Sequence, residues 1–402
     1  MDHDFPSPWL SIVGLGEDGA LGLSAAASAA LAQAEVVAGS SRHLALLPDL
    51  SCQRMPWPVP FADGIAPLLA LRGRRVVMLA SGDPFWFGAG SCVVRHLEAH
   101  EWRALPAPSS FSLAAARLGW PLEHLSCLGL HAAPLGRLRP LLCRGARLLV
   151  LLRDAAAVAA LARYLAESGF GASILHVLEA LGGPRERRRS VRAEAFALDD
   201  VIHPVAVGVE VLGQGWSLPR SAGLPDDEFL HDGQITKQRV RALALCALAP
   251  RAGELLWDIG AGSGSVSIEW LLAHGSCQAA AIEADPMRAS RIVDNARRLG
   301  VDRLRVSQGR APQALEGLAA PDAVFIGGGL CESLLQAVWD LLPLGCRLVA
   351  HAVTLESEAL LGVWHARAGG SLLRIELAEA GALGARRAWH PAYPIVQWSA
   401  TR

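Results

Sequence analysis

Three glycines at alternate positions, from Gly260 to Gly264, form the most informative group in this sequence of 402 residues. They follow an apolar run that ends in Asp258, and they precede residues 266–272, whose apolar spacing predicts a helix. Glycines between a strand and a helix let a ligand approach the main chain, where backbone N–H groups and the positive helix end point toward it. We expect a cofactor cradle here, and its expected contacts are Gly260, Ala261, Gly262, Ser263 and Gly264.

The spacing of these glycines favours S-adenosylmethionine as the cofactor, because dinucleotide enzymes use G-x-G-x-x-G. Glu283 ends the next predicted strand, where its carboxylate can accept hydrogen bonds from both ribose hydroxyls. A dehydrogenase would use the same contact, so Glu283 alone does not separate the two classes. Gly309 and Ala311, in a G-R-A-P turn after a third strand, could enclose the adenine. Asp258 could orient the loop or meet the ammonium of the methionine part, although either carboxylate alone could equally cap a helix or solvate a strand end.

Short apolar runs alternate with longer segments of helical spacing around this loop. That alternation is typical of α/β domains with mostly parallel sheets. Further strands follow toward the C-terminus. The predicted helices are 237–248, 266–272 and 286–299, and the predicted strands are 254–257, 279–282, 304–307, 323–326 and 347–350.

The first half of the chain shows the same alternation but does not align with the second half as a repeat. Its predicted helix is 24–34, with Ser24 as the N-cap. Residues 215–229, rich in Gly, Ser, Pro and Asp, break the pattern and predict a domain boundary, which gives domains 1–218 and 219–402. The predicted strands of the first half are 9–13, 35–38, 75–80, 147–152, 173–178 and 203–211.

The first half also contains a formal G-x-G-x-x-G, residues 14–19. The acid nearest the expected distance is Glu35, which begins its strand and is therefore badly placed for a ribose, so a dinucleotide site is excluded. Two later strand-end turns, residues 81–88 and 106–111, are rich in Gly, Pro and Ser, as are loops that line a cleft between lobes. Asp83 is the residue in these turns that we expect to be functional; its alternative role is that of an Asp-Pro turn former.

Together these three turns resemble the tetrapyrrole methylase family, over residues 10–212. The stretch from Val177 to Glu186 resembles the branch of that family that acts at C5 of precorrins. The family more often has a proline after the second glycine, where this chain has Glu17. The resemblance implies a two-lobed domain whose turns bind S-adenosylmethionine, with contacts at Gly14, Gly16, Gly82, Asp83, Ser109 and Ser110.

The second half resembles the cobalamin-pathway enzymes that methylate C15 of a precorrin and decarboxylate its acetate side chain. The resemblance spans most of residues 223–360 and rests on G-L-P-D-D-E-F, I-T-K-Q-R-V-R, W-D-I-G-A-G-S-G-S-V-S-I-E and A-V-T-L-E. It implies a Rossmann-like class I methyltransferase domain with Thr236 as a further cofactor contact. His351 stands where that family is expected to have Asn.

The two resemblances together imply a substrate, precorrin-6Y, that is methylated at C5 by the first domain. The second domain would methylate C15 and remove the carboxyl of the C12 acetate, giving precorrin-8. Methyl transfer needs mainly in-line positioning and exclusion of water, and the residues indicate no metal or covalent nucleophile. No catalytic acid for the decarboxylation is assigned, and the candidates are His231, His351 and Glu356.

Basic residues of the first half could attract the carboxylates of such a substrate. Arg185 and the run 187–189 form one group, although a solvated loop explains most of them. Arg42 and His43, after the second strand, form a weaker group.

Composition excludes several other classes of protein. Hydrophobic residues make up 52% of the chain, but an Arg, Asp, Glu, Gly or Pro interrupts every long apolar segment within a dozen or so residues, well short of a membrane-spanning helix. Eight cysteines lack a C-x-x-C pair, so we expect reduced thiols and a cytoplasmic protein, and the start Met1–Asp4 lacks the basic residues of a secretory signal. The formal net charge of −1 argues against nucleic acid as a partner. We expect a soluble homo-oligomer without membrane contact.

Two alternatives stay open at this stage. The fused domains could methylate another tetrapyrrole or an RNA, although the near-zero charge disfavours RNA. One half could instead have lost catalysis and serve to hold substrate or to assemble the enzyme. The altered first turn at Glu17 makes this second alternative conceivable for the N-terminal half.

Overall fold

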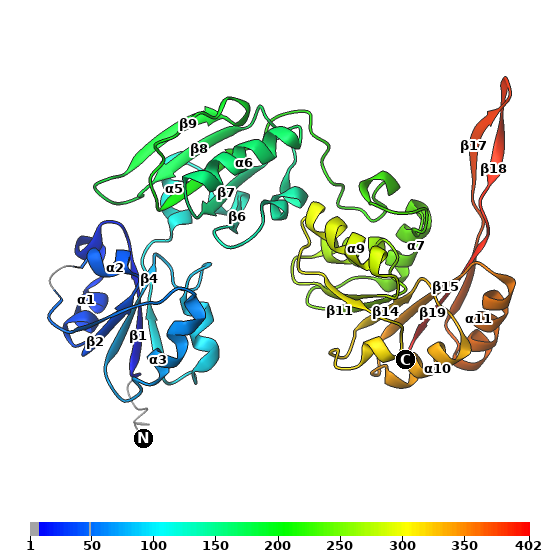
Figure 1. Ribbon diagram of the computed structural model, residues 1–402, viewed down its shortest axis with the longest axis horizontal. Helices are drawn as coiled ribbons and strands as arrows, with labels where there is room; N and C mark the ends of the chain where they lie inside the picture. The colour runs from blue at the N-terminus through cyan, green and yellow to red at the C-terminus, as the bar shows by residue number, and fades with distance from the viewer. Residues whose placement is uncertain (1–7, 48–49) are drawn as a thin grey trace. The chain divides into compact units, whose positions relative to one another are not determined.

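The computed structural model describes residues 8–47 and 50–402 (Figure 1). The start Met1–Asp4, on which the expectation about a secretory signal rests, lies outside the described residues. Among the described residues, no helix is long and apolar enough to cross a membrane. The chain forms two compact units, one of Met1–Ala133 with Leu142–Trp216 and the other of Pro134–Leu141 with Ser217–Arg402.

The first sheet of the first unit has five parallel strands in the order β3-β2-β4-β1-β5. Every residue of β1, an interior strand between β4 and β5, is buried, because helices cover both faces of the sheet. Val13 packs with Leu31 of α1 on one face, whereas Ile12 packs with Leu68 of α3 on the other. Ser24 caps α1, as predicted, by accepting a hydrogen bond from Ala27 N. The elements are β1 (Leu10–Leu15), α1 (Ala25–Ala32), β2 (Val36–Gly39), α2 (Ser41–Ala45), β3 (Gln53–Pro56), α3 (Ile65–Leu69), β4 (Val76–Ser81), α4 (Gly90–Val93) and β5 (Trp102–Leu105).

The second sheet of this unit has the order β6-β7-β10-β8-β9. Only β6 and β7 are parallel, so the prediction of a mostly parallel sheet is wrong for this lobe. The cause is local: the connection between β8 and β9 is too short for a crossover, and the chain can only return antiparallel. The elements are α5 (Ser110–Leu118), β6 (Ser126–Gly129), β7 (Arg147–Leu152), α6 (Ala155–Glu167), β8 (Ile174–Glu179), β9 (Arg187–Arg192) and β10 (Val205–Glu210).

The basic run 187–189 begins strand β9 and is not a solvated loop, which corrects the sequence-based expectation. Arg187 and Arg189 both pair with Glu179, whose side chain is fully buried, and with Asp200. Glu179 also accepts a hydrogen bond from Ile202 N at 2.7 Å. The arginines therefore fasten β9 to β8, and little of their charge remains free to attract a substrate.

The second unit is built on a seven-stranded sheet in the order β13-β12-β11-β14-β15-β19-β16. The first five strands are parallel, and β19 runs antiparallel to both of its neighbours. The strand order reverses beside β11, which is where open α/β sheets bind their ligands. This is the Rossmann-like arrangement expected from the sequence, and the predicted strands lie within two residues of the observed ones. The strands of the sheet are β11 (Leu255–Ile259), β12 (Gln278–Glu283), β13 (Arg305–Gln308), β14 (Ala323–Ile326), β15 (Arg347–Ala352), β16 (Ser371–Ile375) and β19 (Ile395–Thr401).

Helices cover both faces of this sheet, and a two-stranded ribbon extends from it between β16 and β19 (Figure 1). The ribbon strands are β17 (Ala378–Leu383) and β18 (Arg386–Pro391). The helices are α7 (Gln238–Leu248), α8 (Ser265–Ala273), α9 (Pro286–Arg298), α10 (Glu332–Leu341) and α11 (Leu355–Ala368).

Glu179→Ala tests the fastening of β9. Removing this fully buried carboxylate leaves Arg187 and Arg189 with Asp200 as their only shared carboxylate and leaves Ile202 N without its acceptor, so we expect the full chain to lose about 2 kcal/mol of unfolding free energy in urea. Glu194→Ala is the control, because Glu194 and Arg192 are both at least half exposed and their pair should contribute less than about 1 kcal/mol. Equal effects of the two variants would contradict this account.

Candidate functional site

The predicted cradle of the second unit lies between β11 and α8. Gly260 has φ +68° and Gly264 has φ +74°, a region that glycine adopts without strain. A Cβ at Gly260 would lie 2.8 Å from the backbone of Gly328, and one at Gly264 would lie 2.7 Å from the side chain of Ile292. The loop is thus pressed against the turn after β14 on one side and against α9 on the other. The expectation that its backbone N–H groups point at a ligand is wrong for Gly260, Ala261 and Gly264, because the first two donate to Ile282 O and the third donates to Ala261 O.

Glu283 lies at the end of β12 and is 6% exposed. Its Oε2 accepts a hydrogen bond from Gly262 N at 2.8 Å, and its Oε1 accepts one from Asp285 N at 2.9 Å. The carboxylate therefore orients the glycine loop, and each oxygen keeps a lone pair for a further donor such as a ribose hydroxyl. Gly309 N donates to the carbonyl of Glu283, which places the G-R-A-P turn with Ala311 beside this carboxylate.

Asp258 lies beneath the loop and is 1% exposed. Its Oδ2 accepts hydrogen bonds from Ser267 N at 3.1 Å and Ser267 Oγ at 2.5 Å. Its Oδ1 is buried without a hydrogen-bond partner among the described residues, as is the hydroxyl of Ser263. Burial raises the pKa of Asp258 to about 6, although the hydrogen bonds from Ser267 act in the opposite direction. A cationic ligand group would compensate for this unpaired carboxylate oxygen.

A buried ion pair joins three of the motifs that carried the sequence resemblance. Arg241, 0% exposed, donates from Nε to Glu269 Oε1 at 2.6 Å and pairs with Asp226 at 3.1 Å. Glu269 in turn accepts hydrogen bonds from Gly223 N at 2.6 Å and Leu224 N at 2.9 Å. The segment before α7 is thus tied to α8, the helix that follows the glycine loop. Sequence reasoning did not single out this pair, although a glutamate within the apolar run of α8 was a visible signal.

A second buried residue, Asn295 of α9, fastens the same segment to the loop itself. Its Nδ2 donates to Ser263 O at 2.9 Å and to Leu230 O at 3.0 Å, and its Oδ1 accepts from Leu230 N at 2.7 Å. Thr236 lies farther along this segment, and its carbonyl accepts a hydrogen bond from Arg241. Thr236 is thereby fixed through its carbonyl, and Gln234, two residues before it, has its carbonyl oxygen 3.5 Å from a Cβ built at Gly262.

The three candidate acids for decarboxylation lie in different settings. His351 is buried, its Nε2 is 2.9 Å from Gln397 Oε1, and its ring meets that of Phe325 edge-on. Burial lowers the pKa of His351, so the imidazole is neutral and poorly suited to donate a proton. Glu356 is exposed on the first turn of α11, and His231 Nδ1 accepts from Gly233 N. None of these contacts assigns the acid.

In the first unit, the three predicted turns meet at the carboxyl ends of β1, β4 and β5. A Cβ at Gly14 would lie 2.0 Å from Gly82 O and 2.5 Å from Ala107 N. Gly82 N donates to Leu15 O at 3.0 Å, and Ala107 N donates to Gly82 O at 3.1 Å. Segments that are far apart in the sequence are thus joined directly through their backbones.

A cavity of about 600 Å³ opens in front of these turns. Gly16, Gly82, Asp83, Ser109 and Ser110 line it, whereas Gly14 is not among its lining residues. Ser109 also caps α5 by accepting from Ser112 N at 3.0 Å. Asp83 Oδ1 accepts from Phe85 N at 2.8 Å, so this side chain supports its own turn as well as facing the cavity.

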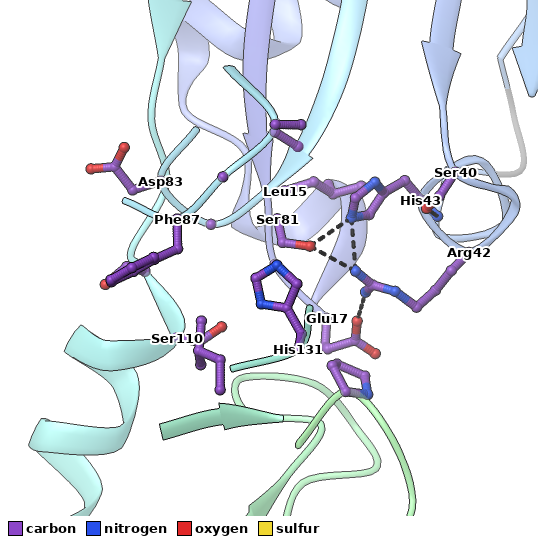
Figure 2. Close-up of a pocket in the computed structure, with 18 of the residues that line it drawn as sticks. Leu15, Glu17, Ser40, Arg42, His43, Ser81, Asp83, Phe87, Ser110 and His131 are labelled. Atoms are coloured by element: carbon purple, nitrogen blue, oxygen red, sulfur yellow. Dashed lines mark hydrogen bonds and ion pairs between the residues drawn. The ribbon is translucent and has the colours of Figure 1, made fainter. Parts of the chain in front are cut away.

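The cavity wall holds a polar network around Arg42 (Figure 2). Arg42 donates to Glu17, to Ser81 Oγ at 2.8 Å and to His43 Nε2 at 2.8 Å. Glu17, in the turn where a proline was expected, also pairs with Arg185 at 3.3 Å. Burial and the neighbouring Arg42 lower the pKa of His43 to about 3, so its imidazole is neutral and its Nε2 accepts from the guanidinium. The side chains of Glu17 and His43 are thus both held by hydrogen bonds or ion pairs within the cavity wall.

Comparison with known proteins supports both halves of this description. A model of the tetrapyrrole (corrin/porphyrin) methylases matches residues 10–197, and a model of the precorrin methyltransferase domain matches residues 227–402. Both expected domain folds are confirmed. The crystal structure of the C-terminal domain of precorrin-6Y C5,15-methyltransferase from Rhodobacter capsulatus is 52% identical, with a TM-score of 0.45, and covers 46% of this chain and 100% of that chain.

Two relatives match nearly the whole chain, and both are named precorrin-6Y C(5,15)-methyltransferase [decarboxylating]. The protein from Sinorhizobium sp is 50% identical over 401 residues, which cover 98% of this chain and 97% of the relative. The protein from Mycobacterium tuberculosis is 41% identical over 397 residues, which cover 97% and 99%. With this identity over almost its full length, the chain belongs to the family of decarboxylating precorrin-6Y C(5,15)-methyltransferases.

Proposed function

We propose that this chain methylates precorrin-6Y at C5 and C15 with S-adenosylmethionine, and that it removes the carboxyl of the C12 acetate to give precorrin-8. The observation that carries the proposal is that one chain has two separate sets of glycine turns at strand ends, one in each unit. The chain also matches bifunctional relatives over almost its full length. The N-terminal site would serve C5, and the C-terminal site would serve C15 and the decarboxylation.

In the C-terminal site, S-adenosylmethionine would supply an electrophilic methyl group, and the chain would hold it in line with the nucleophilic carbon. The unpaired Oδ1 of Asp258 fits the ammonium of the methionine part, and Glu283 fits the ribose hydroxyls. Gly309 and Ala311 would border the adenine, and Thr236 would close the site from the preceding segment.

In the N-terminal site, the turns at Gly16 and Gly82 leave open backbone in front of the cavity, where the donor would lie. Ser110, the first residue of α5, and Asp83 would contact it from the side. The cavity also has an apolar wall that includes Trp57 and Phe87, which suits the face of a macrocycle.

Product analysis tests this function. Wild-type enzyme given precorrin-6Y and S-adenosylmethionine with a deuterated methyl group should yield, by mass spectrometry, a product with two labelled methyls and one carbon dioxide less. Gly262→Arg places a long side chain in the cradle, so its product should gain at most the C5 methyl and keep its carboxyl.

Gly275→Arg is the control for that variant, because Gly275 is exposed and an added Cβ meets nothing within 4 Å. It should give the wild-type product. A wild-type product with one methyl and an intact carboxyl would refute the proposed function, whereas two methyls from Gly262→Arg would refute the placement of the second site.

Asp258→Asn tests the ammonium contact. The carboxyl of the empty site becomes protonated as pH falls below about 6. The KM for S-adenosylmethionine in C15 methylation should therefore rise as pH falls through that value and be constant above it. We expect the Asn variant to show a KM about tenfold higher and to lack this dependence. An unchanged KM and pH profile would contradict the contact.

The same variant should stabilise the ligand-free chain. Because burial raises the pKa of Asp258 from 3.8 to about 6, ionisation of this group opposes folding. The penalty is absent below pH 3.8 and complete above pH 6, where it amounts to about 3 kcal/mol. Asp258→Asn should therefore resist urea better than wild type at pH 7 and lose that advantage at pH 4. Lower stability at pH 7 would contradict the assignment of a buried, unpaired carboxylate.

A further inference from the structure

The cavity of the first unit holds an imidazole that none of the preceding contacts uses. His131 follows β6, lines the cavity and is exposed. Figure 2 shows its ring projecting into the space that the labelled residues surround. Among the described residues, its side chain has no hydrogen-bond or ion-pair partner. Both ring nitrogens are therefore open to a ligand in the cavity.

The other groups in the cavity wall that could accept a proton are engaged. Glu17 is held by Arg42 and Arg185. Asp83 Oδ1 accepts from Phe85 N of its own turn, and the proposed function assigns this carboxylate to contact with the methyl donor. His43 accepts from Arg42 through Nε2, the nitrogen that carries its free lone pair in the neutral form.

Two more charged groups and one more imidazole face the same cavity. Arg42 and Arg153 are cations and accept no proton. His203 is a second exposed imidazole without a partner among the described residues. The choice of a proton acceptor is therefore between His131 and His203.

The proposed reaction at C5 requires such an acceptor. C5 is a meso carbon and carries one hydrogen. When C5 attacks the methyl group, the new C–C bond forms as the S–CH₃ bond breaks. The donor leaves as a neutral thioether, and the positive charge passes to the macrocycle. The C–H electron pair then returns to the conjugated ring as the C5 proton departs, so each turnover releases one proton that a positioned base can accept.

We propose that His131 is the general base that accepts the C5 proton at an open ring nitrogen. The inference rests on the proposed function of the first unit. We choose His131 over His203 because the ring of His131 projects into the cavity from the end of β6 (Figure 2). Neutral imidazole accepts the proton and releases it to solvent through the open side of the cavity.

His131→Gln tests this role, with C5 methylation followed by mass spectrometry of the product. We expect kcat to fall about 100-fold or more, because a general base contributes at least that factor. The KM for S-adenosylmethionine should stay within about twofold. The acidic limb of the wild-type pH profile of kcat/KM should disappear, because that limb reports the essential base of the free enzyme. Added imidazole should partly restore the activity of His131→Ala.

Two further variants make the test specific. His124→Gln, at an exposed position outside the cavity lining, should behave as wild type. His203→Gln should keep the acidic limb; a loss of that limb in this variant and not in His131→Gln would assign the base to His203 and overturn the proposal.

A His131→Gln enzyme with wild-type kcat and pH profile would also overturn it, as would a variant whose defect lies wholly in KM. Failure of the proposed function looks different, because wild-type enzyme would then add no methyl at C5.

Discussion

Both sites depend on backbone-to-backbone contact between the ends of neighbouring parallel strands. A Cβ at Gly14 would lie 2.0 Å from Gly82 O, and a Cβ at Gly260 would lie 2.8 Å from the backbone of Gly328. Any other residue at these positions would force the turns apart, because a side chain would take the space of the facing main chain. With glycine, each turn folds back beside its neighbour and is held there by its own N–H groups: Gly82 N donates to Leu15 O, Gly260 N donates to Ile282 O, and Gly262 N donates to Glu283.

In the second unit, buried polar side chains hold the glycine loop and the segment before α7 in place. Arg241 and Asn295 tie the segment before α7 to the glycine loop and its helix, and they satisfy backbone groups that would otherwise be buried unpaired. Asp258 and Ser263 are exceptions among the described residues, because Asp258 Oδ1 and the Ser263 hydroxyl are buried without a hydrogen-bond partner. Such a group lowers the stability of the empty protein and favours a ligand that can compensate for it, so stability and binding are opposed at Asp258.

The sequence predicted the loops better than the network that holds them. Glycine spacing and strand-end carboxylates are local patterns, so the cradle at Gly262 and the position of Glu283 followed directly from them. The two carboxylate partners of Arg241 lie 15 and 28 residues away, and no periodicity pairs them with it. The antiparallel lobe was missed because its strands are short apolar runs that look the same in either direction. The strand β9 was missed because its arginines resemble a solvated loop until Glu179 is placed beside them.

The central claim is that one chain carries two independent methyl-donor sites. The most direct test is the stoichiometry of S-adenosylmethionine bound to the full chain, measured by equilibrium dialysis. The account predicts two molecules per wild-type chain and one per Gly262→Arg chain, since the second site alone is filled by the new side chain. A wild-type stoichiometry of one, or a Gly262→Arg chain that still binds two, would contradict it.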